Sequence, residues 1–408
     1  MICRHCGADL NLTMVDLGTC PPSNSYLPPD ELDAPEKWYP LRVMVCTQCW
    51  LVQTADFIDR EECFSSTYAY FSSCSTSWVE HARRYTDSMI ERFELGTKSR
   101  VLEVAANDGY LLQHFVARGI PCYGIEPTES TAAVARQKGI EIVSLFFGLA
   151  LARRLVHERG HVGLLAANNV FAHVPNINDF AAGIFEMLAP DGVATIEFPH
   201  VLQLIRQNYF DTIYHEHFSY LSLHSARSIL AAAGLEVFDI DELPTHGGSL
   251  RVYARRRDGV ERPCSPKVGE FLEVEKVAGL LDPQIYLSFP KRVEKVKDDL
   301  VTFLLQMKKE GKSIAAYGAA AKGNTLLNYA GVRKDLLPFI VDRSLGKIGT
   351  FMPGSRIPIL EERALREAKP QIILILPWNL KDEVTEQLAY TREWGAKLAV
   401  ALPALEIL

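Results

Sequence analysis

The sequence lacks several features that would place it in a particular class of protein. No apolar run approaches the about 18 residues needed to cross a membrane, so we expect no membrane-spanning segment. The chain starts Met-Ile-Cys-Arg-His-Cys, without a basic stretch followed by an apolar core, so we expect no signal peptide. Its 26 Gly and 22 Pro among 408 residues are too few for a fibrous or low-complexity chain.

An excess of charge of one sign is also missing. The 43 Lys and Arg residues face 50 Asp and Glu residues, for a formal net charge of −7, and neither sign forms a long run. Because nucleic-acid-binding proteins usually carry a basic patch, we expect no nucleic-acid partner. Nine Cys, an odd number in a chain long enough to bury its own core, favour a reducing compartment over a disulfide framework. We therefore expect a cytoplasmic protein of two or three domains.

The cysteines are informative by their spacing. Four of them form two C-x2-C pairs: Cys3, Cys6, Cys46 and Cys49. Each pair can form a tight turn that presents two thiolates, and two such turns give the tetrahedral four-sulfur set that zinc prefers. Four protein ligands leave no open position, so we expect a structural zinc site. The alternative is two unrelated pairs of buried thiols. His5 could replace a thiolate, although four Cys make this unnecessary.

Residues 101–112 read as a buried strand, a turn of small residues and a helix start. The next strand ends in Glu126, and in open α/β folds an acid at this position commonly holds a ribose diol. The turn lacks a full G-x-G-x-x-G, because Ala105 and Ala106 stand where glycines are expected and only Gly109 remains. A pyrophosphate has a poor cradle here, so the turn favours S-adenosylmethionine over a dinucleotide. The alternative is an α/β turn without a ligand.

Later strands continue this pattern. One ends in Asn168 and Asn169, at the sheet edge where open α/β folds bind ligands. Another follows at 191–198, and 236–240 can pair with 249–254 as an antiparallel closing pair. That order predicts a class I methyltransferase sheet. We expect the cofactor to be bound by Glu103, Asn107, Asp108, Gly109, Glu126, Pro127, Asn168 and Asn169.

Tyr214-His215-Glu216-His217 places four polar side chains in a row, which is costly to bury without purpose. In a strand, Tyr214 and Glu216 share one face and the two His the other. In a turn or helix, Tyr214 and His217 converge. Both arrangements bring an acid or base near an oxygen donor, although a satisfied hydrogen-bond network is equally compatible. A metal site at the two His lacks a third ligand at a convincing spacing. Further polar candidates are His173 and Tyr70.

The last third of the sequence predicts a second α/β unit. Residues 270–312 are amphipathic and charged, with Pro283 and Pro290 breaking the pattern, and predict helices that link two domains. Residues 313–325 repeat the strand, small-residue turn and helix of the central segment. Lys322 lies beside the backbone N–H groups of the helix start, a good place for a phosphate. The alternative is a Lys on a solvated loop.

Together these motifs resemble a known family, the sugar-nucleotide C-methyltransferases of deoxysugar biosynthesis, of the C-3′-methyltransferase type typified by the D-tetronitrose enzyme. Besides the zinc pairs, the motifs that carry the resemblance are Asn107-Asp108-Gly109, Tyr214-His215-Glu216-His217, Thr245-His246-Gly247-Gly248-Ser249 and Tyr317-Gly318-Ala319-Ala320-Ala321-Lys322. The resemblance spans essentially the whole chain. It implies an α/β protein with a zinc-binding domain at 1–62, a class I S-adenosylmethionine-binding methyltransferase domain at 63–258, and a second Rossmann-like domain at 259–408.

The resemblance implies methyl transfer from S-adenosylmethionine to a ring carbon of a nucleotide-linked 4-keto deoxysugar. The expected ring carbon is C3, and C5 is the alternative. The carbon nucleophile is an enolate, and a His with an ordinary pKa of about 6.5 suits its formation near neutrality. His217 is implied as the base, Tyr214 as a partner of the enolate oxygen or of the proton transfer, and Glu216 as the group that orients the His. His173 and Tyr70 are implied to line the sugar pocket.

The C-terminal unit is implied to hold the nucleotide diphosphate. Its expected ligands are Lys322, His246, Ser249, Arg251 and Asn379. Other functions stay open at this point: an O- or N-methyltransferase on a nucleotide sugar, a zinc-stabilised sugar-nucleotide oxidoreductase, and a binding scaffold without activity. Three units around one cleft would suffice as a monomer.

Overall fold

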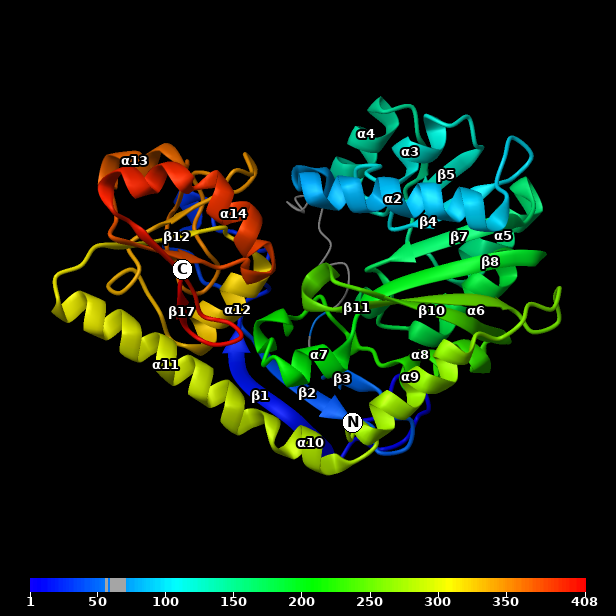
Figure 1. Cartoon of the computed structure of the whole chain (residues 1–408), viewed down its shortest axis with the longest axis horizontal. Helices are drawn as coiled ribbons and strands as arrows, with labels where there is room; N and C mark the ends of the chain where they lie inside the picture. Colours follow the sequence, from blue (N-terminus) through cyan, green and yellow to red (C-terminus); the bar gives the residue numbers. More distant parts are fainter. Residues whose placement is uncertain (56–57, 59–70) are drawn as a thin grey trace.

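Three β-sheets organise the chain, which the computed structural model describes over residues 1–55, 58 and 71–408 (Figure 1). Over these residues, a four-stranded sheet lies at the N-terminus, a seven-stranded sheet in the centre and a six-stranded sheet at the C-terminus. Figure 1 shows the central and C-terminal sheets apart, with the N-terminal strands between them at the bottom of the view. Within the same residues, no helix is both long and apolar enough to cross a membrane.

The N-terminal sheet is antiparallel throughout, in the order β1-β2-β3-β9. Its strands are β1 (Leu12–Cys20), β2 (Tyr39–Val45), β3 (Val52–Thr54) and β9 (Ser219–Tyr220). Between β1 and β2 the proline-rich chain is largely irregular, with one short turn at η1 (Pro29–Glu31), because proline donates no backbone hydrogen bond. The unit expected at 1–62 therefore takes its last strand from the middle of the chain.

The central sheet has the order β10-β11-β8-β7-β4-β5-β6. Its strands are β4 (Val101–Val104), β5 (Cys122–Ile125), β6 (Glu141–Val143), β7 (Val162–Asn168), β8 (Leu188–Pro199), β10 (Leu235–Leu243) and β11 (Ser249–Arg256). All neighbours from β6 to β8 are parallel, and β11 runs antiparallel to both β8 and β10. The antiparallel closing pair and the class I methyltransferase order predicted from the sequence are confirmed.

Helices cover both faces of this sheet. One face is covered by α2 (Thr76–Phe93), α3 (Leu112–Val116) and α4 (Glu129–Gln137). The other is covered by α5 (Leu149–Arg159), α6 (Ile177–Met187), α8 (Leu223–Ala232) and α9 (Pro266–Val277). Burial on both faces explains why β4 and β7 are nearly continuous apolar runs. Helix α9, expected in the C-terminal unit, packs instead on β10 and α8, so by packing the boundary lies after α9.

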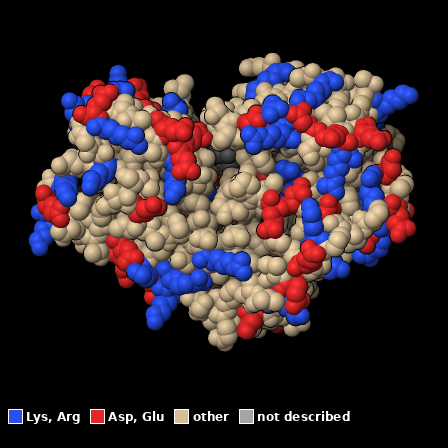
Figure 2. Space-filling view, viewed as in Figure 1, with Lys and Arg blue, Asp and Glu red and all other residues tan. Residues whose placement is uncertain are grey.

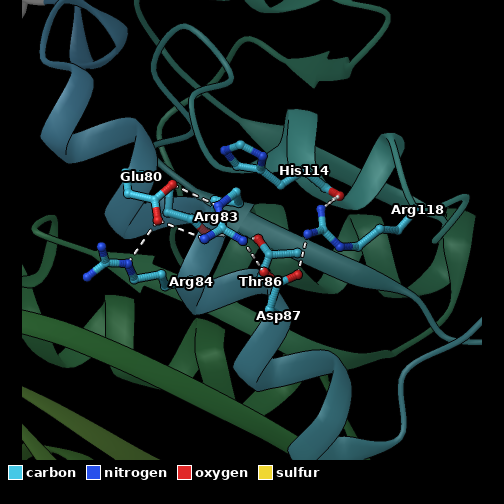
Figure 3. Close-up of polar contacts among 8 residues, drawn as sticks. Glu80, Arg83, Arg84, Thr86, Asp87, His114 and Arg118 are labelled. Carbon is cyan, nitrogen blue, oxygen red and sulfur yellow. Dashed lines mark hydrogen bonds and ion pairs between the residues drawn. The ribbon is translucent and has the colours of Figure 1, made fainter.

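The long helix α2 illustrates how one sequence pattern serves two surfaces. Its inner face buries Ala82, Tyr85 and Met89 against the central sheet. Its outer face carries an ion-pair network, in which Arg83 contacts Glu80 and Asp87, and Arg118 beyond α3 pairs with the same Asp87 (Figure 3). Such exposed pairs contribute little each, so burial of the inner face dominates the stability of α2.

Two helices link the central and C-terminal sheets: α10 (Pro283–Leu287) and α11 (Phe289–Lys309). The prolines predicted to break the helical pattern stand in the first turn of each helix, where a missing N–H costs nothing. The apolar face of α11, which includes Val293, Leu300 and Leu304, belongs to one core with β1 and the C-terminal sheet.

The C-terminal sheet has the order β14-β13-β12-β15-β16-β17, parallel except for β17. Its strands are β12 (Ile314–Tyr317), β13 (Ile340–Val341), β14 (Ile359–Leu360), β15 (Ile372–Ile375), β16 (Lys397–Val400) and β17 (Glu406–Ile407). The helices are α12 (Ala321–Tyr329), α13 (Arg363–Ala368) and α14 (Lys381–Gln387). This is the predicted second Rossmann-like unit.

The N-terminal unit joins the other two. Cys3, Cys46 and Cys49 belong to one apolar core with the central sheet, whereas β1 and β2 contribute to another with α11 and the C-terminal sheet. The space-filling view shows two lobes separated by a notch, with acidic and basic side chains mixed on both (Figure 2). In this view the notch lies above the N-terminal strands, and the N-terminal unit shares an apolar core with each large unit.

Candidate active site

The zinc site is built by two turns of the same shape. In the first, Gly7 N–H donates to the carbonyl of Cys3, and in the second Trp50 N–H donates to the carbonyl of Cys46. Gly7 and Trp50 both have a positive φ, of 74° and 59°.

The four sulfurs lie within 4.8 Å of one another, with Cys3–Cys49 and Cys6–Cys46 each at 3.5 Å. Sulfurs bound at about 2.3 Å to one tetrahedral ion lie about 3.8 Å apart, so the set fits zinc.

Both ring nitrogens of His5 contact side chains outside the cysteine cluster. Its Nδ1 lies 2.8 Å from Asn178 Oδ1 on α6, and its Nε2 lies 3.1 Å from Ser228 Oγ on α8. These contacts dock the first zinc turn on the methyltransferase sheet's helices. All four metal ligands are therefore thiolates, as predicted.

The turn after β4 has the backbone shape of a glycine-rich turn, although alanine occupies part of it. Ala105 and Asn107 have φ of 60° and 48°, in the left-handed region that is unfavourable for residues other than glycine. Gly109 has φ of 77°, and a Cβ there would lie 2.4 Å from Ile140 Cδ1. The turn thus passes close to its neighbours and leaves room for a ligand at the sheet edge.

Glu126, directly after β5, closes this turn. Its Oε2 accepts from the N–H of Asn107 and its Oε1 from the N–H of Thr128, both at 2.9 Å. Each carboxylate oxygen keeps a further lone pair for a hydroxyl group. Burial raises the pKa of Glu126, with these amides opposing the shift. Pro127 follows it and begins the loop that leads to α4.

Polar atoms without partners gather at the ends of the neighbouring strands. Asn168 Oδ1, both side-chain polar atoms of Asn169, and Asp108 Oδ1 are buried and lack a hydrogen-bond partner among the described residues. Buried polar groups are otherwise paired, so these atoms indicate a missing ligand. Glu103 lies beneath them, fully buried, and burial raises its pKa well above the usual range. The residues present fit S-adenosylmethionine.

Two of the expected cofactor residues have a second task. Asn107 Oδ1 accepts from the N–H of Ser72 at 2.9 Å, and Asp108 Oδ2 accepts from the N–H of Ser73 at 3.1 Å. These contacts hold the short 3-10 segment η2 (Ser72–Cys74) against the cofactor turn. Tyr70, predicted in the sugar pocket, lies outside the described residues.

The Tyr214–His217 motif forms a hydrogen-bonded turn, in which His217 N–H donates to the carbonyl of Tyr214 at 2.9 Å. The rings of Tyr214 and His217 lie 4.0 Å apart, so the turn alternative of the sequence analysis is the one adopted. His215 points the opposite way, with Nε2 3.2 Å from the carbonyl of Pro40 in β2. Glu216 Oε1 accepts from Asn24 Nδ2 at 2.5 Å. The two inner members of the motif thus fix the turn on the N-terminal unit.

His217 is oriented by a backbone carbonyl. Its Nδ1 lies 2.8 Å from the oxygen of Thr212, in the short 3-10 helix η4 (Phe210–Thr212). Because a carbonyl only accepts, Nδ1 carries the proton and the neutral ring keeps a lone pair on Nε2. The expected orienting role of Glu216 therefore belongs to the Thr212 carbonyl, a backbone group that no sequence motif marks.

Other basic groups surround His217. His173, in η3 (Phe171–His173), lies 4.6 Å from it ring to ring. Burial, with the charges of His173, Lys322 and His246, lowers the pKa of His217 well below its usual value. Burial lowers the pKa of His173 to about 4 and that of His246 to about 3. His217 is therefore neutral at pH 7. His217 and His246 also line one cavity, together with Ala172, Leu204, Tyr209 and Tyr220.

Lys322 and Asn379 meet at the edge of the C-terminal sheet. Lys322 Nζ donates to Asn379 Oδ1 at 2.9 Å and lies 4.6 Å from the ring centre of Trp378, in η6 (Trp378–Leu380). Burial lowers the pKa of Lys322 to about 8, and the charge of Asp211 opposes this shift. The ammonium group is thus charged at pH 7, and its charge acts on both His217 and His246.

Ser249 and Arg251 are not placed to hold a ligand. Arg251 is 4% exposed and its guanidinium binds Glu197 of β8 at 2.7 Å. Ser249 Oγ donates to the carbonyl of Thr245, and Thr245 Oγ1 donates to Glu197. The prediction that Ser249 and Arg251 bind the nucleotide is therefore replaced by a role in holding the loop at η5 (Thr245–Gly247). That loop determines the position of His246, whose φ is 54°.

Three residues outside the predicted motifs, Glu197, His81 and Trp78, also support the site through long-range contacts. Glu197 accepts from His81 as well as Arg251, and these contacts outweigh its burial and lower its pKa to about 2. Trp78 packs against His81 and against His246. Glu197 ends a buried strand that the sequence does show, so an acid at that strand end was the available signal. Trp78 and His81 lie on α2, where no local motif marks them.

The fold and the site together define a class I S-adenosylmethionine-dependent methyltransferase with a structural zinc site. The chain belongs to the C-methyltransferase family: it is 32% identical over 401 residues to C-methyltransferase NovU of Streptomyces niveus, covering 98% of this chain and 95% of that protein. Domains described as a zinc binding domain, a methyltransferase domain and a C-methyltransferase C-terminal domain match residues 3–64, 78–240 and 244–403.

Solved structures with similarity to this chain are distant. A methyltransferase from Anabaena variabilis has a TM-score of 0.39 and 14% identity, over 50% of this chain and 96% of its own. Magnesium protoporphyrin IX methyltransferase from Synechocystis, with bound S-adenosylmethionine, has a TM-score of 0.36 and 13% identity, over 50% of this chain and 100% of its own. Similarity at this level carries no argument about the site.

Proposed function

We propose that this protein transfers a methyl group from S-adenosylmethionine to C3 of a nucleotide-linked 4-keto deoxysugar, through an enolate, in branched-chain deoxysugar biosynthesis. The observation that carries the proposal is the orientation of His217. Its Nδ1 proton is bound to the Thr212 carbonyl, so Nε2 can accept a proton, and Tyr214 lies against the ring. Transfer to an oxygen or nitrogen of the sugar would not need removal of a proton from carbon.

In the proposed reaction His217 Nε2 removes the proton from C3. The C–H electron pair becomes the C3–C4 double bond, and the carbonyl π pair moves to the C4 oxygen, where the Tyr214 hydroxyl donates a hydrogen bond. S-adenosylmethionine supplies a sulfonium methyl group. The enolate pair then forms the new carbon–carbon bond, while the methyl–sulfur pair leaves with sulfur. Holding both reactants in line supplies much of the rate.

The substrate is held between the two Rossmann-like units in this proposal. Lys322 and Asn379 bind the diphosphate from the C-terminal side, because a charged ammonium group at a sheet edge attracts phosphate oxygens. His173 and His246 face the sugar, and both are neutral at pH 7 because burial lowers their pKa. Neutral imidazoles both donate and accept, which suits hydroxyl and keto groups.

Mass spectrometry in deuterium oxide tests the proposal. Wild-type protein with S-adenosylmethionine and a 4-keto-6-deoxy nucleotide sugar should add one methyl group, and sugar that has not been methylated should carry deuterium at C3 in place of the proton. His217→Asn should lose both signals and keep its affinity for S-adenosylmethionine, since the base acts on the sugar. His215→Asn is the matched control, because His215 lies in the same turn but faces β2.

Near-normal turnover of His217→Asn would contradict the assignment of the base. Methyl transfer to a sugar without a keto group, with no exchange, would instead indicate O- or N-methylation.

A further inference from the structure

The segment that carries His217 belongs by sequence to the central unit but packs on the C-terminal one. Tyr209 stacks on Trp378, with ring centres 3.7 Å apart and planes 16° apart. Thr325 Oγ1 on α12 donates to the carbonyl of Ile213 at 2.8 Å. The position of the base therefore depends on contacts across the notch.

Asp211 lies in the middle of this contact and has no role in the chemistry proposed so far. It is fully buried, and its Oδ2 accepts from the indole Nε1 of Trp378 at 2.7 Å. Its Oδ1 has no hydrogen-bond partner among the described residues. A buried carboxylate is costly unless something nearby requires its charge. The structure offers a reason in Lys322.

Lys322 and Asp211 both contact the indole of Trp378. The ammonium group of Lys322 lies over the Trp378 ring, and the indole N–H of the same ring binds Asp211. Burial raises the pKa of Asp211 to about 6, and Lys322 opposes this shift. Each charge therefore stabilises the other inside the protein, and Trp378 fixes their relative positions.

Asp211 is also connected, through the backbone of the next residue, to the proposed base His217. The next residue, Thr212, supplies the carbonyl that binds Nδ1 of His217. Both residues belong to η4, so a shift of Asp211 would move that carbonyl and release the ring. A continuous set of contacts thus runs from Lys322 through Trp378, Asp211 and Thr212 to His217.

We infer that Asp211 is a positioning residue, which couples the diphosphate-binding Lys322 of the C-terminal unit to the orientation of the base His217. The inference rests on the proposed function for the identity of the substrate. Binding of the diphosphate at Lys322 would then affect the orientation of His217 through Trp378 and Asp211. A displacement of about 1 Å at a reacting group can cost about 10²-fold in rate, so a small shift of η4 is sufficient.

Three substitutions separate the parts of this coupling. Asp211→Asn removes the charge but keeps an oxygen for the indole. Trp378→Phe removes the indole donor but keeps a ring against Tyr209. Thr325→Val removes the tether from α12, and it keeps the inference testable if a change at Asp211 prevents folding. The matched control is Tyr286→Phe, which removes a buried hydroxyl bond to the Leu280 carbonyl, of 2.7 Å, away from the site.

The first measurement separates kcat from KM and adds the rate of proton exchange at the substrate carbon. We expect Asp211→Asn to raise the KM for the nucleotide sugar and lower kcat. Trp378→Phe and Thr325→Val should lower kcat by about tenfold to 10²-fold, with exchange lowered in proportion. Tyr286→Phe should leave all of these unchanged. Values within about a factor of two of wild type for all three site variants would overturn the inference.

The second measurement needs no substrate. Long-range proton–nitrogen spectra of histidine-labelled protein, with His217→Asn for assignment, report which ring nitrogen of His217 carries the proton. We expect the Nδ1-protonated form in wild type and a mixture of forms in Trp378→Phe and Thr325→Val. If wild type fails to methylate keto sugars, the proposed function fails while this spectrum still tests the coupling. Unchanged spectra in both variants would overturn the coupling alone.

Discussion

The turn after β4 and the turn after β12 share the same backbone hydrogen bonds. In the first, Ala106 N–H donates to the carbonyl of Ile125, and Glu126 accepts from the backbone of Asn107 and Thr128. In the second, Gly318 N–H donates to the carbonyl of Val341, and Asp342 accepts from the N–H groups of Ala319 and Ser344 at 2.7 and 2.8 Å. Local sequence logic therefore gives two equivalent turns, each closed by an acid after its second strand.

The surroundings of the two turns differ. At the second turn, the hydroxyl of Tyr26 and the ammonium of Lys347 both donate to the carbonyl of Ala319, at 2.6 and 2.9 Å. At the first, the neighbouring Asn168 and Asn169 have buried polar atoms without partners among the described residues. We call the first the open turn and the second the closed turn. The same backbone motif therefore has uncovered polar neighbours in one unit and is covered by other side chains in the other, according to what packs against it.

Loss of zinc should have the largest effect, since the N-terminal unit shares an apolar core with each of the two large units. Cys46→Ser removes a buried ligand, and structural zinc contributes about 10 kcal/mol or more to folding. We expect soluble yield and bound zinc to fall together, measured by expression and elemental analysis. Cys264→Ser, at an exposed cysteine, is the control and should change neither. Full zinc content in Cys46→Ser would contradict the four-sulfur site.

Exchange of the two acids tests the comparison directly. Glu126→Gln should lower affinity for S-adenosylmethionine by about 10- to 100-fold, because a charged acceptor for the ribose hydroxyls is lost. Asp342→Asn removes the same charge from the closed turn and should leave that affinity unchanged. Calorimetric titration of both variants measures the difference. Equal losses in the two variants would mean that the turns are not functionally distinct.

The pH dependence of the KM for the nucleotide sugar should follow the protonation of Lys322 in the C-terminal unit. The pKa of Lys322 is lowered by burial to about 8, so its charge is present below pH 8 and is lost as pH rises through that value. The KM for the nucleotide sugar should then rise by about tenfold per pH unit. Affinity for S-adenosylmethionine at the open turn should not follow. Lys322→Arg keeps its charge and should abolish the rise. If KM still rises with pH in Lys322→Arg, the rise is caused by the titration of another group.

The smallest effect is expected at the closed turn itself. Tyr26→Phe removes one hydrogen bond to Ala319 and should lower the free energy of unfolding by about 1 kcal/mol. Denaturant unfolding measures this change, and S-adenosylmethionine titration provides the control. A change in the affinity for S-adenosylmethionine would show that the closed turn also affects the cofactor site.

The sequence predicted those parts of the site that are built locally. Paired Cys spacing predicted the zinc ligands, because each turn is complete within a few residues. The strand pattern predicted that Glu126, Asn168 and Asn169 lie at one edge of the central sheet, because the carboxyl ends of parallel strands meet there. The Tyr214–His217 motif was recognised, but its turn was only one of two alternatives, since neither strand nor turn is favoured strongly by four polar residues.

Roles that depend on distant partners were predicted poorly. Glu216 binds Asn24 rather than orienting His217, and Arg251 binds Glu197 rather than a ligand. Glu216 was expected to act on a neighbouring His and Arg251 on a ligand, whereas the observed partner of each lies far away in the sequence. Spacing within a motif carries no information about such partners.

The sequence by itself determined the order of units, the zinc ligands and the two acid-closed turns, because each depends on neighbouring residues and on strand and turn geometry. The tertiary structure alone decided which turn stays open, which carbonyl orients His217, and that Lys322 and Asp211 contact the same indole ring. The segment that carries His217 is held by contacts with residues more than a hundred positions away, at Thr325 and Trp378. There, burial and charge set protonation and orientation, and neither is written in any local stretch of sequence.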